Sequence, residues 1–205
     1  QRRKPPAGID RLAEFQAQRV PVPALRVVLQ PPRRRQGRAV GAGGDLDADI
    51  RGGDLALRLA DTMHLVDWIR EREGEGDLPL GCIGLSGGGH TTELLAAVDT
   101  RIDVACIQGY FSYWTEQIMD ITHCNCNYIP GLLRYFEQDD ICALICPRPL
   151  LVTTATEDNV APVEPFEKAY ASLKQVYVDQ DAGDRLDEHV FEGGHRFDGE
   201  KAFPF

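Results

Sequence analysis

The sequence lacks several features that define whole classes of protein. No apolar run approaches the roughly 18 residues that a bilayer-spanning helix needs, and no apolar signal-peptide core follows residues 1–6. Six cysteines in 205 residues are too few for a disulfide scaffold, and Cys82 and Cys106 lie inside apolar runs, where buried thiols are common. We therefore expect a cytoplasmic protein with reduced cysteines and no membrane partner.

Positive charge is scarce except at one end of the chain. The formal net charge is -10, which argues against nucleic acid as a partner. Residues 1–53 are the exception: they form an irregular basic segment rich in Pro, Arg and Gly, in which only residues 24–29 resemble a short strand. Three interpretations stay open: a flexible or loosely docked arm, sequence that is not authentic to the domain, or a basic nucleic-acid arm without interleaved aromatic residues.

Residues 54–205 carry the regular patterns of one α/β domain. Apolar residues recur at helical spacing from Leu55 to Ile69, and a short apolar run typical of a strand buried on both faces follows at 78–85. Further strands are predicted at 102–107, 150–154 and 186–192, and further helices at 92–98 and 164–177. This order predicts a mainly parallel sheet with flanking helices, and the alternation at 186–192 predicts an edge strand.

The segment Gly84-Leu85-Ser86-Gly87-Gly88 matches the G-x-S-x-G nucleophile motif and lies between a predicted strand and a predicted helix. A strand that turns at once into a helix strains the serine backbone and leaves no room for side chains two residues on either side. Ser86 is therefore our candidate nucleophile, and the Gly87 amide is our candidate oxyanion donor. A phosphate-binding loop is disfavoured because no Lys follows the glycines.

A serine nucleophile needs a base, and the base needs a carboxylate that orients it. Asp158 follows a predicted strand and is our candidate acid, with Glu157 as its alternative. His195 follows the last predicted strand on a glycine-rich turn and is our candidate base. The carboxyl ends of parallel strands share one edge of a sheet, so these residues are expected to converge.

These motifs resemble the α/β hydrolase superfamily, and most closely its acetyl xylan esterase-like and dienelactone hydrolase-like branch. The likeness covers residues 54–205 and includes Gly-Leu-Ser-Gly-Gly-Gly-His at 84–90, Pro-Arg-Pro-Leu-Leu at 147–151 and Glu-Gly-Gly-His-Arg-Phe at 192–197. The segment His-Cys-Asn-Cys-Asn-Tyr-Ile-Pro-Gly-Leu at 123–132 is similar to a sub-branch described only as esterases.

The resemblance implies Ser86, Asp158 and His195 as a catalytic triad that needs no cofactor. It implies hydrolysis of a small-molecule carboxylic ester, of the acetyl-ester or carbohydrate-ester type, through an acyl-enzyme. Such hydrolases take a second oxyanion donor from a His-Gly loop after an early strand, and residues 1–53 hold no match to it. The N-terminal strands are therefore expected to be incomplete. An exopeptidase-like serine hydrolase and a non-catalytic hydrolase-fold remnant remain as alternatives.

The long connection after the strand at 102–107 is the expected place for the walls of a substrate pocket. Tyr110, Trp114 and Tyr128 are our candidate substrate-binding residues there. His123 lies beside two cysteines in the same connection, but a Cys-x-Cys pair with one His lacks a fourth zinc ligand, so no metal is predicted. His90 is expected to cap or pack, and the sequence does not indicate an oligomeric state.

Overall fold

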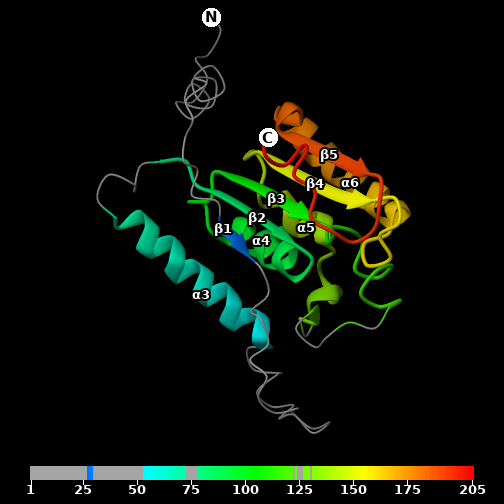
Figure 1. The fold of residues 1–205 in the computed structure, drawn as a ribbon, viewed down its shortest axis with the longest axis horizontal. Coiled ribbons are helices and arrows are strands. Elements are labelled where there is room, and N and C mark those ends of the chain that lie inside the picture. Colours follow the sequence, from blue (N-terminus) through cyan, green and yellow to red (C-terminus); the bar gives the residue numbers. More distant parts are fainter. Residues whose placement is uncertain (1–26, 30–52, 73–77, 122, 124–126, 130) are drawn as a thin grey trace, which may run out of the picture.

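The computed structural model describes residues 27–29, 53–72, 78–121, 123, 127–129 and 131–205. A five-stranded parallel sheet forms the centre of the fold, and its strands lie in the order in which they occur along the chain (Figure 1). The strands are β1 (Val27–Leu29), β2 (Gly81–Leu85), β3 (Val104–Gln108), β4 (Leu150–Ala155) and β5 (Leu186–Phe191). The prediction of an α/β fold with a mainly parallel sheet is confirmed.

Helices connect the strands and supply most of the core. They are α3 (Gly53–Arg70), α4 (Gly87–Val98), α5 (Gln138–Ala143) and α6 (Val163–Asp179), with short 3-10 turns at η2 (Leu132–Arg134) and η3 (Gly183–Arg185). The helical spacing predicted for α3 is observed, because Leu55, Val66 and Ile69 are buried. None of the helices in the described ranges combines the length and apolarity needed to cross a membrane.

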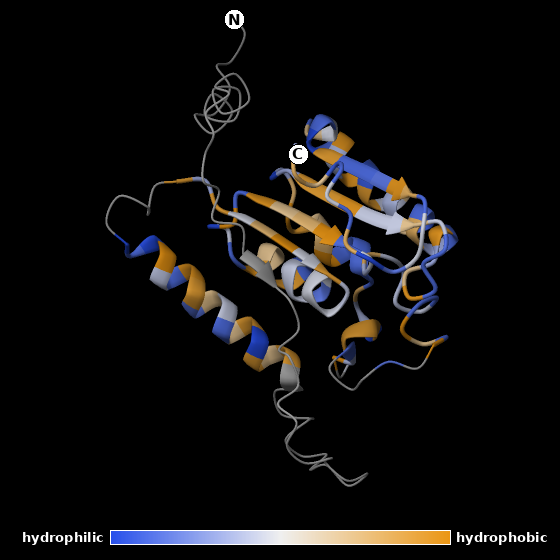
Figure 2. Cartoon of the chain, viewed as in Figure 1, coloured by the Kyte–Doolittle hydropathy of each residue, from blue (hydrophilic) through white to orange (hydrophobic). Residues whose placement is uncertain are grey.

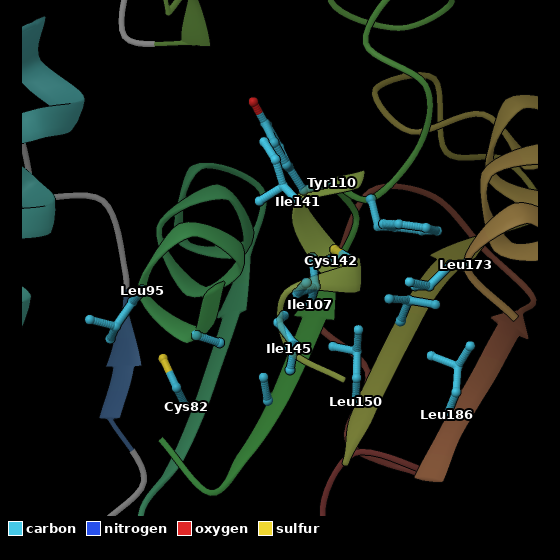
Figure 3. Packing of buried hydrophobic residues seen from close by; sticks show 14 of the residues in the cluster. Cys82, Leu95, Ile107, Tyr110, Ile141, Cys142, Ile145, Leu150, Leu173 and Leu186 are labelled. Carbon is cyan, nitrogen blue, oxygen red and sulfur yellow. The ribbon is translucent and has the colours of Figure 1, made fainter. Parts of the chain in front are cut away.

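The main hydrophobic core lies between one face of the sheet and these helices (Figure 3). Ile107, Leu150 and Leu173 are fully excluded from solvent there, and each such side chain stabilises the fold by about 1.5–3 kcal/mol. A smaller cluster on the opposite face of the sheet contains Ile83, Cys106 and Leu151 and packs against Phe197 and Ala202. The segment that follows His195 therefore covers this second face.

β5 is the edge strand that its alternation predicts. Leu186 and Phe191 are buried at its two ends, while the residues between them are partly or fully exposed. Figure 2 shows the same contrast, because β2 and β3 are apolar whereas β5 is largely hydrophilic.

Most of the predicted basic segment, residues 1–26 and 30–52, lies outside the described residues, so the domain boundary at residue 53 stays a prediction. Its one predicted strand is observed as β1, where Val27–Leu29 pair with Cys82–Gly84 of β2. β1 is the single strand ahead of β2 in the described part of the chain, and the expected incompleteness of the N-terminal strands also stays a prediction.

Candidate active site

Ser86 occupies the sharp turn between β2 and α4. Its backbone has φ 57° and ψ -123°, a conformation that costs free energy for any residue with a side chain. A Cβ on Gly84 would overlap the backbone of Gly88 and lie 2.7 Å from the Thr92 hydroxyl, so glycine is required two residues before the serine. The Ser86 amide donates to the Gln108 carbonyl at 2.9 Å, which ties the turn to the end of β3.

Asp158 lies in the turn after β4, with its side chain buried. Its Oδ1 accepts hydrogen bonds from the Val160 amide at 2.8 Å and the Ala161 amide at 3.0 Å. Burial alone would raise the pKa of this carboxyl, but hydrogen bonds from His195 and from these two amides lower it below its usual value. The turn therefore holds a carboxylate rather than a carboxylic acid.

His195 follows β5 and faces this carboxylate. Its Nδ1 lies 2.9 Å from Oδ2 and 3.0 Å from Oδ1 of Asp158, and its side chain is 24% exposed. Gly109, at the end of β3, lies against both side chains: a Cβ built on it would be 3.0 Å from His195 Cε1, 3.1 Å from Leu85 Cδ1 and 3.2 Å from Asp158 Oδ2. The three predicted catalytic segments thus converge on one edge of the sheet, beside Gly109.

Comparisons with known proteins fit this layout, although no protein-family model matches the chain. The chain is 31% identical over 132 residues to "Putative hydrolase YtaP" of Bacillus subtilis (strain 168), a match that covers 62% of this chain and 44% of that protein. Methylesterase BT1017 superposes with a TM-score of 0.57 and 21% identity, over 73% of this chain and 33% of that one. A carbohydrate esterase family 15 glucuronoyl esterase from Caldicellulosiruptor kristjansonii superposes with a TM-score of 0.60 and 16% identity, over 73% of this chain and 47% of that one.

The chain has the α/β hydrolase fold. The resemblance found in the sequence is confirmed at this level. The chain spans less than half the length of each of the three proteins just named.

Gly87, the predicted oxyanion donor of the hydrolase, is the first residue of α4. Amides in the first turn of a helix have no partner within the helix, and the helix dipole favours negative charge beside them. Arg58 of α3, which the sequence analysis did not single out, lies close by: its Nη1 would be 3.7 Å from a Cβ on Gly87. A guanidinium at this distance adds positive charge to the region where an oxyanion would form.

His90, one turn beyond Ser86, packs as expected. It is buried, its ring stacks on Tyr110 with centroids 4.5 Å apart, and the edge of Trp114 lies 5.8 Å away. Burial, together with the charge of Arg58, lowers the pKa of His90 to about 3, so the imidazole is neutral near pH 7.

The predicted substrate-binding residues lie around one cavity of about 240 Å³. Trp114 and Tyr128 line it, whereas Tyr110 is buried and reaches it only through a hydrogen bond from its hydroxyl to Asn127 Oδ1 at 3.1 Å. Asn127 is the polar residue of the remaining lining, and the rest is apolar and comes from Ile118, Ile129, Leu132 and Leu133. A direct substrate contact for any of these residues stays a prediction.

The two cysteines beside His123 in the sequence, Cys124 and Cys126, lie outside the described residues. Within the described ranges, one group could hold an ion: His189, Asp198 and Glu200, whose ligand atoms lie within 4.8 Å of one another. Glu200 is exposed, and Asp198 also pairs with the Arg196 guanidinium at 3.5 Å. Such groups are common without an ion, and the absence of a metal stays a prediction.

Proposed function

We propose that this chain carries the nucleophile, acid and base of a serine hydrolase that cleaves carboxylic esters. The observation that carries the proposal is the contact of His195 with the buried Asp158 carboxylate, at the same sheet edge as the strained Ser86. A strained serine at a strand-to-helix turn and a carboxylate-bound histidine serve no evident packing purpose there. Together they make a weak hydroxyl nucleophilic.

The proposed reaction follows from these positions. Ser86 Oγ attacks the ester carbonyl and gives its proton to His195 Nε2, while Asp158 accepts from Nδ1–H and stabilises the imidazolium. The Gly87 amide donates to the oxyanion. When the tetrahedral intermediate collapses, His195 protonates the departing alcohol and an acyl-enzyme remains. Water, deprotonated by His195, then releases the acid and restores Ser86.

Two observations support a carboxylic ester as the substrate class. The solved structures named above are called a methylesterase and a glucuronoyl esterase, and both names denote ester cleavage. Trp114 and Tyr128 line the cavity described above, and aromatic faces suit sugar rings and apolar acyl groups alike. An ester of the acetyl or carbohydrate type agrees with both observations.

A second candidate is a non-catalytic hydrolase-fold module. It is favoured by one observation: residues 1–53 hold no match to the His-Gly loop that supplies a second oxyanion amide in such hydrolases. Loss of one such donor lowers the rate of comparable enzymes by about 10²–10³-fold.

A fluorophosphonate probe, read out by intact mass, separates the two candidates. The chain has three serines, so Ser86→Ala and His195→Ala can be compared with Ser172→Ala, which removes the serine of α6. Labelling that needs Ser86 and His195 but not Ser172 supports the hydrolase. A wild-type protein that shows a cooperative thermal transition and does not label supports the module.

A further inference from the structure

Gln108, the last residue of β3, bridges two distant parts of the chain. Its side chain is fully buried and pairs with the backbone of Asp198, ninety residues later. The side-chain Nε2 donates to the Asp198 carbonyl at 2.6 Å, and Oε1 accepts from the Asp198 amide at 3.0 Å. One side-chain amide therefore satisfies both polar groups of one backbone residue, as a neighbouring strand would.

The backbone of Gln108 contacts the turn that carries Ser86. Its carbonyl accepts the hydrogen bond from the Ser86 amide. The next residue, Gly109, has φ 56° and leaves the space that His195 and Asp158 occupy. Gln108 and the residue directly after β3, Gly109, thus contact the segments that carry all three proposed catalytic side chains.

The segment that carries His195 has few other backbone attachments. Its start is fixed by the hydrogen bond from the Glu157 amide to the Gly193 carbonyl at 2.7 Å. From residue 194 to residue 198, the only backbone hydrogen bonds to the rest of the described chain are the two with Gln108. The position of His195 between these points therefore depends on Gln108.

We propose that Gln108 is the positioning residue that fixes the His195 segment relative to Ser86. Its backbone carbonyl fixes the nucleophile turn and its side-chain amide fixes residue 198, and β3 is buried from Ala105 to Gln108. The inference rests on the proposed roles of Ser86 and His195. Gln108 itself does not touch the reacting atoms.

The test compares three variants. Gln108→Met keeps the length of an unbranched side chain and removes both bonds, whereas Gln108→Glu retains the acceptor and loses the amide donor. Tyr177→Phe is the matched control, because Tyr177 is also fully buried and donates to the Arg148 carbonyl at 3.0 Å, at the opposite edge of the sheet. Each variant is first shown to be folded by its thermal transition.

Amide hydrogen exchange measures how firmly Gln108 holds the backbone of Asp198, and it does not depend on catalytic activity. In Gln108→Met the amide of Asp198, which loses its acceptor Gln108 Oε1, should exchange at least tenfold faster than in Tyr177→Phe. Equal protection in both variants would overturn the proposal.

The fluorophosphonate labelling rate then measures the consequence. A displacement of about 1 Å costs about 10²-fold in comparable sites, so Gln108→Met should label 10–100-fold more slowly than wild type, and Tyr177→Phe within twofold of it. With a chromogenic acetate ester, kcat should carry the loss while KM stays within threefold. Normal labelling by a folded Gln108→Met would overturn the proposal. Failure of the wild type to label would instead count against the hydrolase, and the exchange result would still decide the role of Gln108.

Discussion

Glu93 of α4 is a buried carboxyl that the proposed reaction does not use. It lies seven residues after Ser86, it is fully excluded from solvent, and neither carboxyl oxygen has a hydrogen-bond partner among the described residues. Burial raises its pKa well above the usual value, because an ionised carboxylate is poorly solvated inside the core. We predict that this residue makes the folded protein less stable as the pH rises.

The sign and the size follow from proton linkage. Below a pH of about 4.3 both the folded and the unfolded chain hold the proton, and Glu93 costs no stability through ionisation. Above it, the unfolded chain releases the proton while the folded chain keeps it. The free energy of unfolding therefore falls by about 1.4 kcal/mol per pH unit until the pKa in the folded state is reached.

The variant Glu93→Gln removes the titration and keeps the shape of the side chain. Its advantage in stability over the wild type should grow by up to about 2.7 kcal/mol between pH 5 and pH 7, at up to about 1.4 kcal/mol per pH unit while the folded state keeps the proton. Urea unfolding at pH 5, 6 and 7 measures the difference directly. Glu167→Gln, on the exposed face of α6, controls for the loss of one negative charge. A stability difference between Glu93→Gln and wild type that stays constant from pH 5 to 7 would refute the reasoning.

Three further substitutions test the site. Asp158→Asn should slow fluorophosphonate labelling by about 10³–10⁴-fold, because the amide cannot stabilise the His195 imidazolium; labelling within tenfold of wild type would remove Asp158 from the triad. Gly84→Ala should lower the free energy of unfolding by about 3 kcal/mol or more. Gly87→Ala should stay within about 1 kcal/mol, because its Cβ would make an ordinary contact with Arg58 Nη1 at 3.7 Å; thermal unfolding compares the two, and equal effects would contradict the turn geometry. Gly109→Ala should slow labelling by about 10-fold or more, because its Cβ would press on His195, and unchanged labelling would show that the pair adapts.

The helices and strands could be predicted because each buries one face or both, and this burial fixes the spacing of their apolar residues. The strand predicted at 102–107 starts two residues before β3 and ends one residue before it, since Ile102 is buried ahead of the strand and Gln108 extends it. The strand predicted at 78–85 begins only at Gly81, because Pro79 lacks an amide for the ladder and Leu78 is 44% exposed. Hydropathy indicates which residues are buried. Hydrogen bonding to a neighbouring strand decides which of these buried residues belong to a strand.

The predicted catalytic residues could be named from the sequence because each carries a local signal: glycines around Ser86, a strand end before Asp158 and a glycine turn before His195. Gln108 and Arg58 carry none. A glutamine that ends an apolar strand is read as the exposed end of that strand, and only the fold shows residue 198 beside it. An arginine on a helix is read as part of a solvated face, and only the packing of α3 on α4 places it near Gly87.

The contacts that position the three proposed catalytic side chains all arise between residues 84 and 198. Ser86 is held by Gln108, Asp158 by the two amides that follow it, and the His195 segment by Glu157 and Gln108. Each of these contacts joins two residues of the range 84–198, whereas β1, the described part of residues 1–52, pairs with Cys82–Gly84 directly before the serine turn. We therefore expect that a chain altered within residues 1–52, with Val27–Leu29 kept, keeps the ability of Ser86 to react with a fluorophosphonate.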